Sequence, residues 1–107
     1  MKTAQEVKPN YAPVYAAALY PQLARIFVDN GYALAVHGSL ARDFDLIAVP
    51  WVASPSRPSK VLKEITTTFW IRVIGKPTKK KHGRVAHTIS VGHGNCAIDL
   101  SFLPVKK

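Results

Sequence analysis

The stretch YALAVHGSLARDFDLIAVP, residues 32–50, contains the pattern that decides the expected fold. Two apolar runs, 32–36 and 44–49, are each short enough for a buried strand. A glycine and a serine follow the first run, and a proline ends the second. The pattern predicts two strands of a sheet with a Gly-Ser turn directly after the first.

Aspartates stand at alternate positions before and within the second run. Because side chains along a strand point alternately to opposite faces, Asp43 and Asp45 are expected to project to the same side. Asp99 lies in a similar apolar run near the end of the chain. Carboxylates among apolar residues are costly to desolvate unless they are paired or bind a cation. We therefore expect the three to converge on a divalent-metal site. The alternative is that they form ion pairs with Arg42, Arg84 or nearby lysines, or lie at strand ends in solvent.

Helices are expected on both sides of this stretch. Apolar residues at spacings of three and four, ending before Asn30-Gly31, predict a first helix. Pro21 either kinks that helix or divides it into two, because proline donates no backbone hydrogen bond. A second helix is expected after the turn-rich segment 53–59, with its apolar residues on one face.

Two further strands are expected near the end of the chain, at 85–91 and 96–103, joined by a hairpin turn at 92–95. The predicted fold class is therefore α/β (α+β), with a small mixed or antiparallel sheet of about four strands and helices packed on one face. A chain of 107 residues fits one such domain. The expected boundaries are 1–10 for a loose N-terminal lead-in, 11–104 for the domain and 105–107 for a basic tail.

Composition favours an anionic partner. The chain carries 15 Lys and Arg against 6 Asp and Glu, a formal net charge of +9. This excess favours nucleic acid, nucleoside triphosphates or an anionic surface, the alternative being a basic surface without a ligand. Cys96 is the only cysteine, which excludes an internal disulfide and a multi-cysteine zinc site. The sequence shows no signal peptide and no apolar run of about 20 residues, so we expect a cytoplasmic protein outside the membrane.

Positive charge is most concentrated at 72–84, a segment with six basic residues and no acidic residue. It predicts either a phosphate-binding surface, with Arg84 as the best candidate, or a solvated lysine loop. No aromatic residue lies within it, so nothing there predicts a platform for stacking bases. Trp51 and Trp70 are expected to pack in the core or at an edge, the alternative being that they stack on a ligand. The four histidines lack the paired spacing of a zinc site, and His37 is expected either to line the Gly-Ser turn or to be an ordinary strand-end residue.

The run GSLARDFDL, residues 38–46, resembles the signature of the polymerase-β-type nucleotidyltransferase superfamily. That signature has an apolar strand, Gly-Ser, a short helical turn and Asp-x-Asp on a second strand, with a third carboxylate on a later strand. The segment as far as Trp51 is also similar to short, uncharacterised phage-encoded proteins of this fold. The connection from Ser39 to Asp43 is shorter than is usual in the family, and the chain does not contain the additional helical domain of larger members.

The resemblance implies a role for each matching residue. Asp43, Asp45 and Asp99 would be the catalytic and metal-binding residues for Mg²⁺ or Mn²⁺, with Asp99 also helping to deprotonate the acceptor. By the same resemblance, Gly38 and Ser39 would bind the triphosphate. Arg42, Lys81 and Arg84 are further candidates for phosphate binding, independent of the resemblance.

Three functional hypotheses follow from these observations. The first is a minimal nucleotidyltransferase that moves a nucleotidyl group from a nucleoside triphosphate to an unknown acceptor. The second is a non-catalytic module of the same fold that binds nucleic acid or a partner protein of the host. The third is one half of a toxin–antitoxin pair. The final strand is expected to be exposed, so the chain could also form a dimer.

Overall fold

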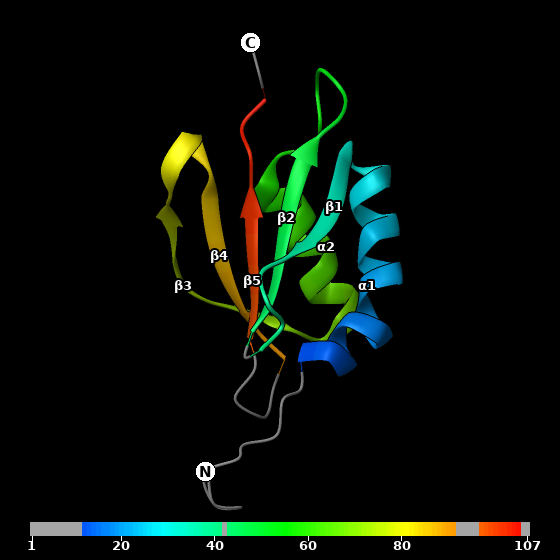
Figure 1. Cartoon of the computed structure of the whole chain (residues 1–107). Helices are drawn as coiled ribbons and strands as arrows, with labels where there is room; N and C mark the ends of the chain where they lie inside the picture. Colours follow the sequence, from blue (N-terminus) through cyan, green and yellow to red (C-terminus); the bar gives the residue numbers. More distant parts are fainter. Residues whose placement is uncertain (1–11, 42, 92–96, 106–107) are drawn as a thin grey trace, which may run out of the picture.

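A mixed sheet of five strands forms the centre of the protein, in the order β1-β2-β5-β4-β3 (Figure 1). The computed structural model describes residues 12–41, 43–91 and 97–105. β2 and β5 run parallel, and the other neighbouring strands are antiparallel. The strands are β1 Tyr32–His37, β2 Phe44–Pro50, β3 Arg72–Lys79, β4 Val85–Ser90 and β5 Ala97–Phe102.

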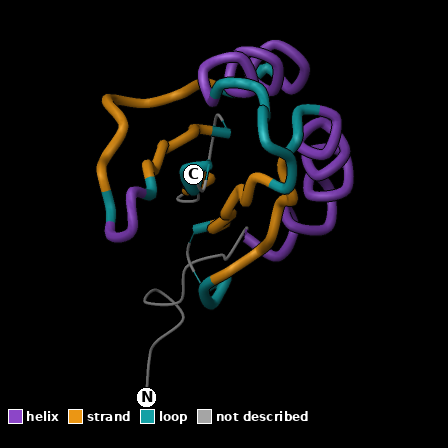
Figure 2. The backbone as a smooth tube through the Cα atoms, turned by 90° about the horizontal axis from the view of Figure 1, so that it is seen from above, coloured by secondary structure: helices purple, strands orange, loops and turns teal. Residues whose placement is uncertain are grey.

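Two α-helices pack on one side of this sheet, which Figure 2 shows from above. They are α1, Ala12–Asp29, and α2, Pro58–Phe69, and a short 3₁₀ turn, η1, covers Lys81–Gly83. The predicted α/β (α+β) class with helices on one face is confirmed, with five strands in place of about four. Each of the four predicted strands is present, and its ends agree with the prediction to within one residue.

α1 runs through Pro21 as a single helix, so the alternative of two short helices is wrong. Beyond the proline, Leu23 and Phe27 lie about one turn apart and are both fully buried. Before it, the Tyr20 hydroxyl donates a hydrogen bond to the carbonyl oxygen of Leu34 in β1. Proline removes one backbone hydrogen bond inside the helix. The helix stays continuous because these contacts hold the parts before and after Pro21 against the sheet.

Asn30 and Gly31 end α1, as the sequence predicts. The Asn30 side chain is 5% exposed, and its Nδ2 donates to the Ile26 carbonyl oxygen (2.8 Å) and to Glu64 Oε1 (3.1 Å). Lys60 Nζ donates to Asn30 Oδ1 (3.2 Å), so one buried side chain connects the end of α1 to α2. Gly31 has a φ of 91°, a left-handed conformation that glycine adopts without steric cost.

The hydrophobic core lies between the helices and one face of the sheet. Phe27 of α1, Tyr32 of β1 and Phe102 of β5 pack together, with ring centroids 5.3–6.3 Å apart. The face of β2 and β5 that carries Asp45 and Asp99 therefore points away from the helices, because side chains alternate along each strand. The other apolar residues of the central strands in this core are Phe44, Leu46, Ala48, Ile89, Ile98 and Leu100.

β3 is the strand that the sequence pattern does not predict. Nearly all of its side chains are exposed, so it shows no alternation of apolar and polar residues. Its pairing with β4 shifts register between Ile74 and Thr78, around Gly75-Lys76-Pro77. An irregular, basic edge strand of this kind resists pairing with a second chain.

β5 is a central strand, which corrects the expectation of an exposed final strand. The two edges of the sheet are β1 and β3, so a dimer formed through β5 has no structural support. Trp51 and Trp70 are 60% and 94% exposed, so neither packs in the core. Trp70 caps α2 with a φ of 58°, a left-handed conformation.

Several predicted features lie outside the described residues: the lead-in at 1–10, Arg42, the turn at 92–95, Cys96 and the last two lysines of the tail. Of the two described helices, neither is both long enough and apolar enough to cross a membrane.

Candidate functional site

Asp45 and Asp99 lie side by side on the two parallel strands of the sheet. Asp45 of β2 is the register partner of Asp99 of β5. Residues directly opposite each other on neighbouring strands project from the same face, with their side chains in reach of one another. Both carboxylates are half-buried on the face away from the helices. The predicted convergence is therefore found for these two aspartates.

A histidine and a threonine extend this pair into a row across four strands. His37 at the end of β1 is the register partner of Asp45, and Thr88 of β4 is the register partner of Asp99. His37 Nε2 is buried, and no hydrogen-bond partner reaches it among the described residues. Sequence analysis missed Thr88. Its place in the row follows from its pairing with Asp99, and the sequence alone does not determine the register of that pairing.

The Gly-Ser turn lies directly against the Asp45 carboxylate. Gly38 has a φ of 76°, and a Cβ atom built there would collide with Asp45 Oδ2. The Ser39 hydroxyl accepts a hydrogen bond from the Ala41 N–H (3.2 Å). Leu40 has a φ of 58°, so the described part of the turn, 38–41, contains no helical turn. Only glycine allows the chain to approach the carboxylate this closely.

The environment raises the pKa of Asp45 above its usual value. Desolvation contributes most, followed by repulsion from Asp99, while His37 opposes the rise and Asp43 adds to it. A negative charge on Asp45 is therefore unfavourable next to a second carboxylate. A cation between the two carboxylates would relieve this repulsion.

Asp43 lies close enough to the pair for its charge to raise the pKa of Asp45, but it stands just outside the strand. It lies in a bend before β2 begins, and its Oδ1 accepts a hydrogen bond from the Ala97 N–H at the start of β5 (3.3 Å). Among the described residues, no three His, Cys, Asp or Glu side chains are grouped so that they could hold a metal ion together. The metal-binding role of Asp43 stays a prediction.

The predicted phosphate-binding residues fall into two groups. Gly38 and Ser39 lie at the acidic pair, whereas Lys81 and Arg84 precede β4, whose Thr88 is level with Asp99. Four residues of strand separate Arg84 from Thr88, about 13 Å. The structure therefore does not bring Lys81 and Arg84 to the aspartates, and their binding of a nucleotide at that site stays a prediction.

Comparison with known proteins finds no relative of this chain. No family model, no curated protein and no solved structure matches the chain. The resemblance to nucleotidyltransferases therefore rests on the residues of the chain itself, and the geometry of the site carries the case for its function.

The acidic pair fits a hard divalent cation in one specific way. Mg²⁺ is usually held by one or two carboxylates and completes its coordination with water and substrate phosphates. Two adjacent carboxylates beside a turn that approaches them without a side chain match this donor set. A cation held by protein side chains alone would need at least three ligands, and no such group is found among the described residues.

Replacing Gly38 by alanine is expected to lower the free energy of unfolding by about 1–3 kcal/mol. The new Cβ is strained at a φ of 76° and collides with the Asp45 carboxylate. Gly75→Ala is the matched control, because Gly75 has a φ of 69° and nothing lies within 4 Å of its Cβ position. Urea denaturation measures both. Equal losses in the two variants would show that the turn does not contact Asp45 in solution.

Asp45→Asn is expected to stabilise the protein near neutral pH. Since the folded protein raises the pKa of this group, ionised Asp45 costs stability above that pKa, and the cost disappears as pH falls below its usual value of about 3.9. Solvent screens the half-buried group, which limits the gain to below about 1 kcal/mol. We expect the midpoint temperature to rise by up to about 4 °C near neutral pH and not at acidic pH. A lower midpoint at neutral pH would show that the carboxylate stabilises the fold.

Proposed function

We propose that this protein binds a nucleoside triphosphate with Mg²⁺ or Mn²⁺ at Asp45 and Asp99 and transfers its nucleotidyl group to an acceptor hydroxyl. The proposal rests on one observation: two adjacent carboxylates on parallel strands lie directly beside the Gly38-Ser39 turn. Phosphoryl-transfer sites combine the same two elements, an acidic pair for the cation and an exposed backbone turn for phosphate oxygens.

The residues of the chain have separate tasks in this reaction. Gly38 lets phosphate oxygens approach the backbone, and the Ser39 hydroxyl, which accepts a hydrogen bond from the Ala41 N–H, donates its own proton to a phosphate oxygen. Asp99 accepts the proton of the acceptor hydroxyl while the oxygen of that hydroxyl bonds to the α-phosphorus. The bond between that phosphorus and the β-phosphate oxygen breaks, and pyrophosphate leaves. When bound, the cation supplies positive charge that neutralises the phosphates.

A second candidate function is polyanion binding without catalysis. The observation in its favour is the basic segment 72–84. The end of this segment that precedes β4 lies away from the acidic pair, so a polyanion could bind there without contacting Asp45 or Asp99. The two functions differ in what they require of Asp45. Catalysis needs its carboxylate, whereas binding of a polyanion at the basic segment does not.

The direct test is pyrophosphate release from each nucleoside triphosphate in the presence of Mn²⁺, with the chain itself, DNA and RNA offered as acceptors. We expect release with the wild type and none with Asp45→Asn, which keeps the shape of the side chain. Asp29→Asn is the control, since Asp29 is an exposed carboxylate at the end of α1. The absence of release with every nucleotide and acceptor, together with absent nucleotide binding, would overturn the proposal.

A further inference from the structure

The end of the sheet opposite to the Gly-Ser turn contains a second candidate site. The ends of β2 and β5 and the turn from β3 to β4 meet there (Figure 1). Between them lies an open depression of about 420 Å³, lined by Val49, Pro50, His82, Leu103 and Pro104. From Asp45 to Pro50 the strand covers about 17 Å, so the depression is separate from the acidic pair.

The basic turn beside the depression has a defined backbone. The Lys80 N–H donates to the Arg84 carbonyl oxygen (2.7 Å), and the Arg84 N–H donates to the Lys81 carbonyl oxygen (3.3 Å). Gly83 packs against the chain after β5, because a Cβ there would lie 3.1 Å from Pro104 Cγ. The lysines are thus held next to the apolar depression and not on a separate loop.

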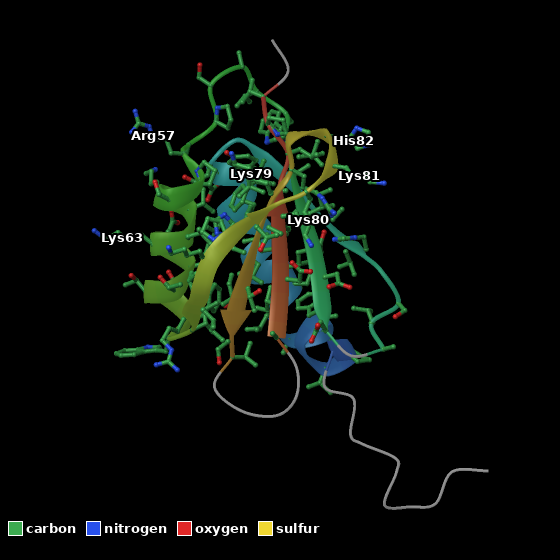
Figure 3. All side chains as sticks on the ribbon, turned by 90° about the vertical axis from the view of Figure 1, so that its left-hand side faces the viewer. Arg57, Lys63, Lys79, Lys80, Lys81 and His82 are labelled. Atoms are coloured by element: carbon green, nitrogen blue, oxygen red, sulfur yellow. The ribbon has the colours of Figure 1, made fainter. Side chains whose placement is uncertain are left out.

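Exposed lysines lie beside this apolar surface. Figure 3 shows Lys79, Lys80, Lys81 and His82 gathered where β3 turns into η1. All four side chains are exposed, and 72–84 contains no acidic residue that could neutralise them. β3 has eight residues, which extend over about 26 Å. Its basic residues Arg72, Lys76 and Lys79 are exposed along this length.

An exposed indole follows the depression directly in sequence. Trp51 comes after Pro50, and its side chain is 60% exposed. Its backbone is fixed, because the Trp51 N–H donates to the Gly31 carbonyl oxygen (3.0 Å). Sequence analysis found no aromatic residue within the basic segment. The fold brings one next to Pro50, which lines the same depression as His82 of the basic segment.

The chemistry of this surface selects one class of ligand. An apolar depression with an exposed indole and an imidazole suits flat rings, and the lysines suit repeated negative charge. Single-stranded nucleic acid offers both, since its unpaired bases can stack on aromatic side chains while its phosphates meet cations. A duplex hides the faces of its bases, and an acidic peptide offers charge without rings.

We propose that this end of the sheet binds single-stranded nucleic acid through a distal surface that consists of Trp51, Lys79, Lys80, Lys81 and His82. Trp51 and His82 contact bases, and the three lysines contact phosphates. The distal surface goes beyond the proposed nucleotidyl transfer and does not depend on it. Its ligand binds at the opposite end of the sheet from the acidic pair.

Fluorescence anisotropy with labelled oligodeoxythymidine of about 12 nucleotides tests the proposal. We expect Trp51→Ala to weaken binding about tenfold and Trp70→Ala, which removes the other exposed indole, to leave it unchanged. Replacing Lys79, Lys80 and Lys81 by glutamine should lower the salt slope of log affinity by about 2, measured between about 50 and 200 mM salt. Arg57→Gln/Lys63→Gln, which removes two exposed charges beside and on α2, is the charge control.

Two further measurements separate this proposal from its competitors. In a Trp70→Phe background Trp51 is the remaining tryptophan, and oligonucleotide binding should quench its fluorescence. Asp45→Asn/Asp99→Asn should bind the oligonucleotide at least as tightly as wild type, which distinguishes this surface from the acidic pair. Equal affinity for polyglutamate, tighter binding of the duplex, or no effect of Trp51→Ala would each overturn the proposal.

Discussion

Phe27→Ala is expected to lower the free energy of unfolding by about 3–5 kcal/mol. Phe27 is fully buried and contacts the rings of Tyr32 and Phe102, so its removal separates α1 from both an edge strand and a central strand. Domains of this size have a total stability of about 5–15 kcal/mol. The variant is therefore expected to be partly unfolded at moderate temperature.

Trp70→Ala is the matched control for this loss, because Trp70 is 94% exposed. We expect it to change the free energy of unfolding by no more than about 0.5 kcal/mol. Urea denaturation of both variants gives the comparison. Similar losses in the two would show that α1 does not pack on the sheet as described.

The double variant Asp45→Asn/Asp99→Asn is expected to lose all stabilisation by nucleotide and metal. In the wild type, a triphosphate with Mn²⁺ at about 100 times its dissociation constant should add about 2.7 kcal/mol. This corresponds to a rise of about 10 °C in the midpoint of thermal unfolding. Because the parallel strands bring these two carboxylates together beside the Gly-Ser turn, we expect no rise once both are replaced.

Asp29→Asn controls for the general loss of negative charge in that experiment. It should keep the full rise, since the exposed Asp29 lies at the end of α1. A rise that survives in the double variant would place the nucleotide elsewhere on the protein. The basic segment 72–84 would then be the first alternative.

Alternation of side chains was sufficient to predict which face the aspartates of the strands occupy. Phe44 and Leu46 are buried, so Asp45 between them points to the opposite face, and Asp99 between Ile98 and Leu100 follows the same rule. The prediction succeeds because a strand with one buried face has a fixed register. Pairing of Asp45 with Asp99 depends on the sheet order, which short sequence patterns do not determine.

Alternation does not determine the direction of the Asp43 side chain, because the rule applies only within a strand. Asp43 precedes β2, where the chain bends and the carboxylate turns to the Ala97 N–H. β3 was missed for a related reason: it is an exposed edge strand without an apolar face. The exposure of Trp51 and Trp70 was also unpredictable from composition, since tryptophan is usually largely buried.

Titration of Mn²⁺, followed by the electron paramagnetic resonance signal of the free ion, tests the acidic pair most directly. The experiment adds a non-hydrolysable nucleoside triphosphate to the wild type, to Asp45→Asn/Asp99→Asn and to Asp29→Asn. We predict that the wild type and Asp29→Asn remove about one or two ions per chain from solution, beyond the ions bound by the nucleotide alone, and that the double variant removes none. Equal uptake by all three proteins, or no uptake by the wild type, would contradict a cation–triphosphate site at Asp45 and Asp99.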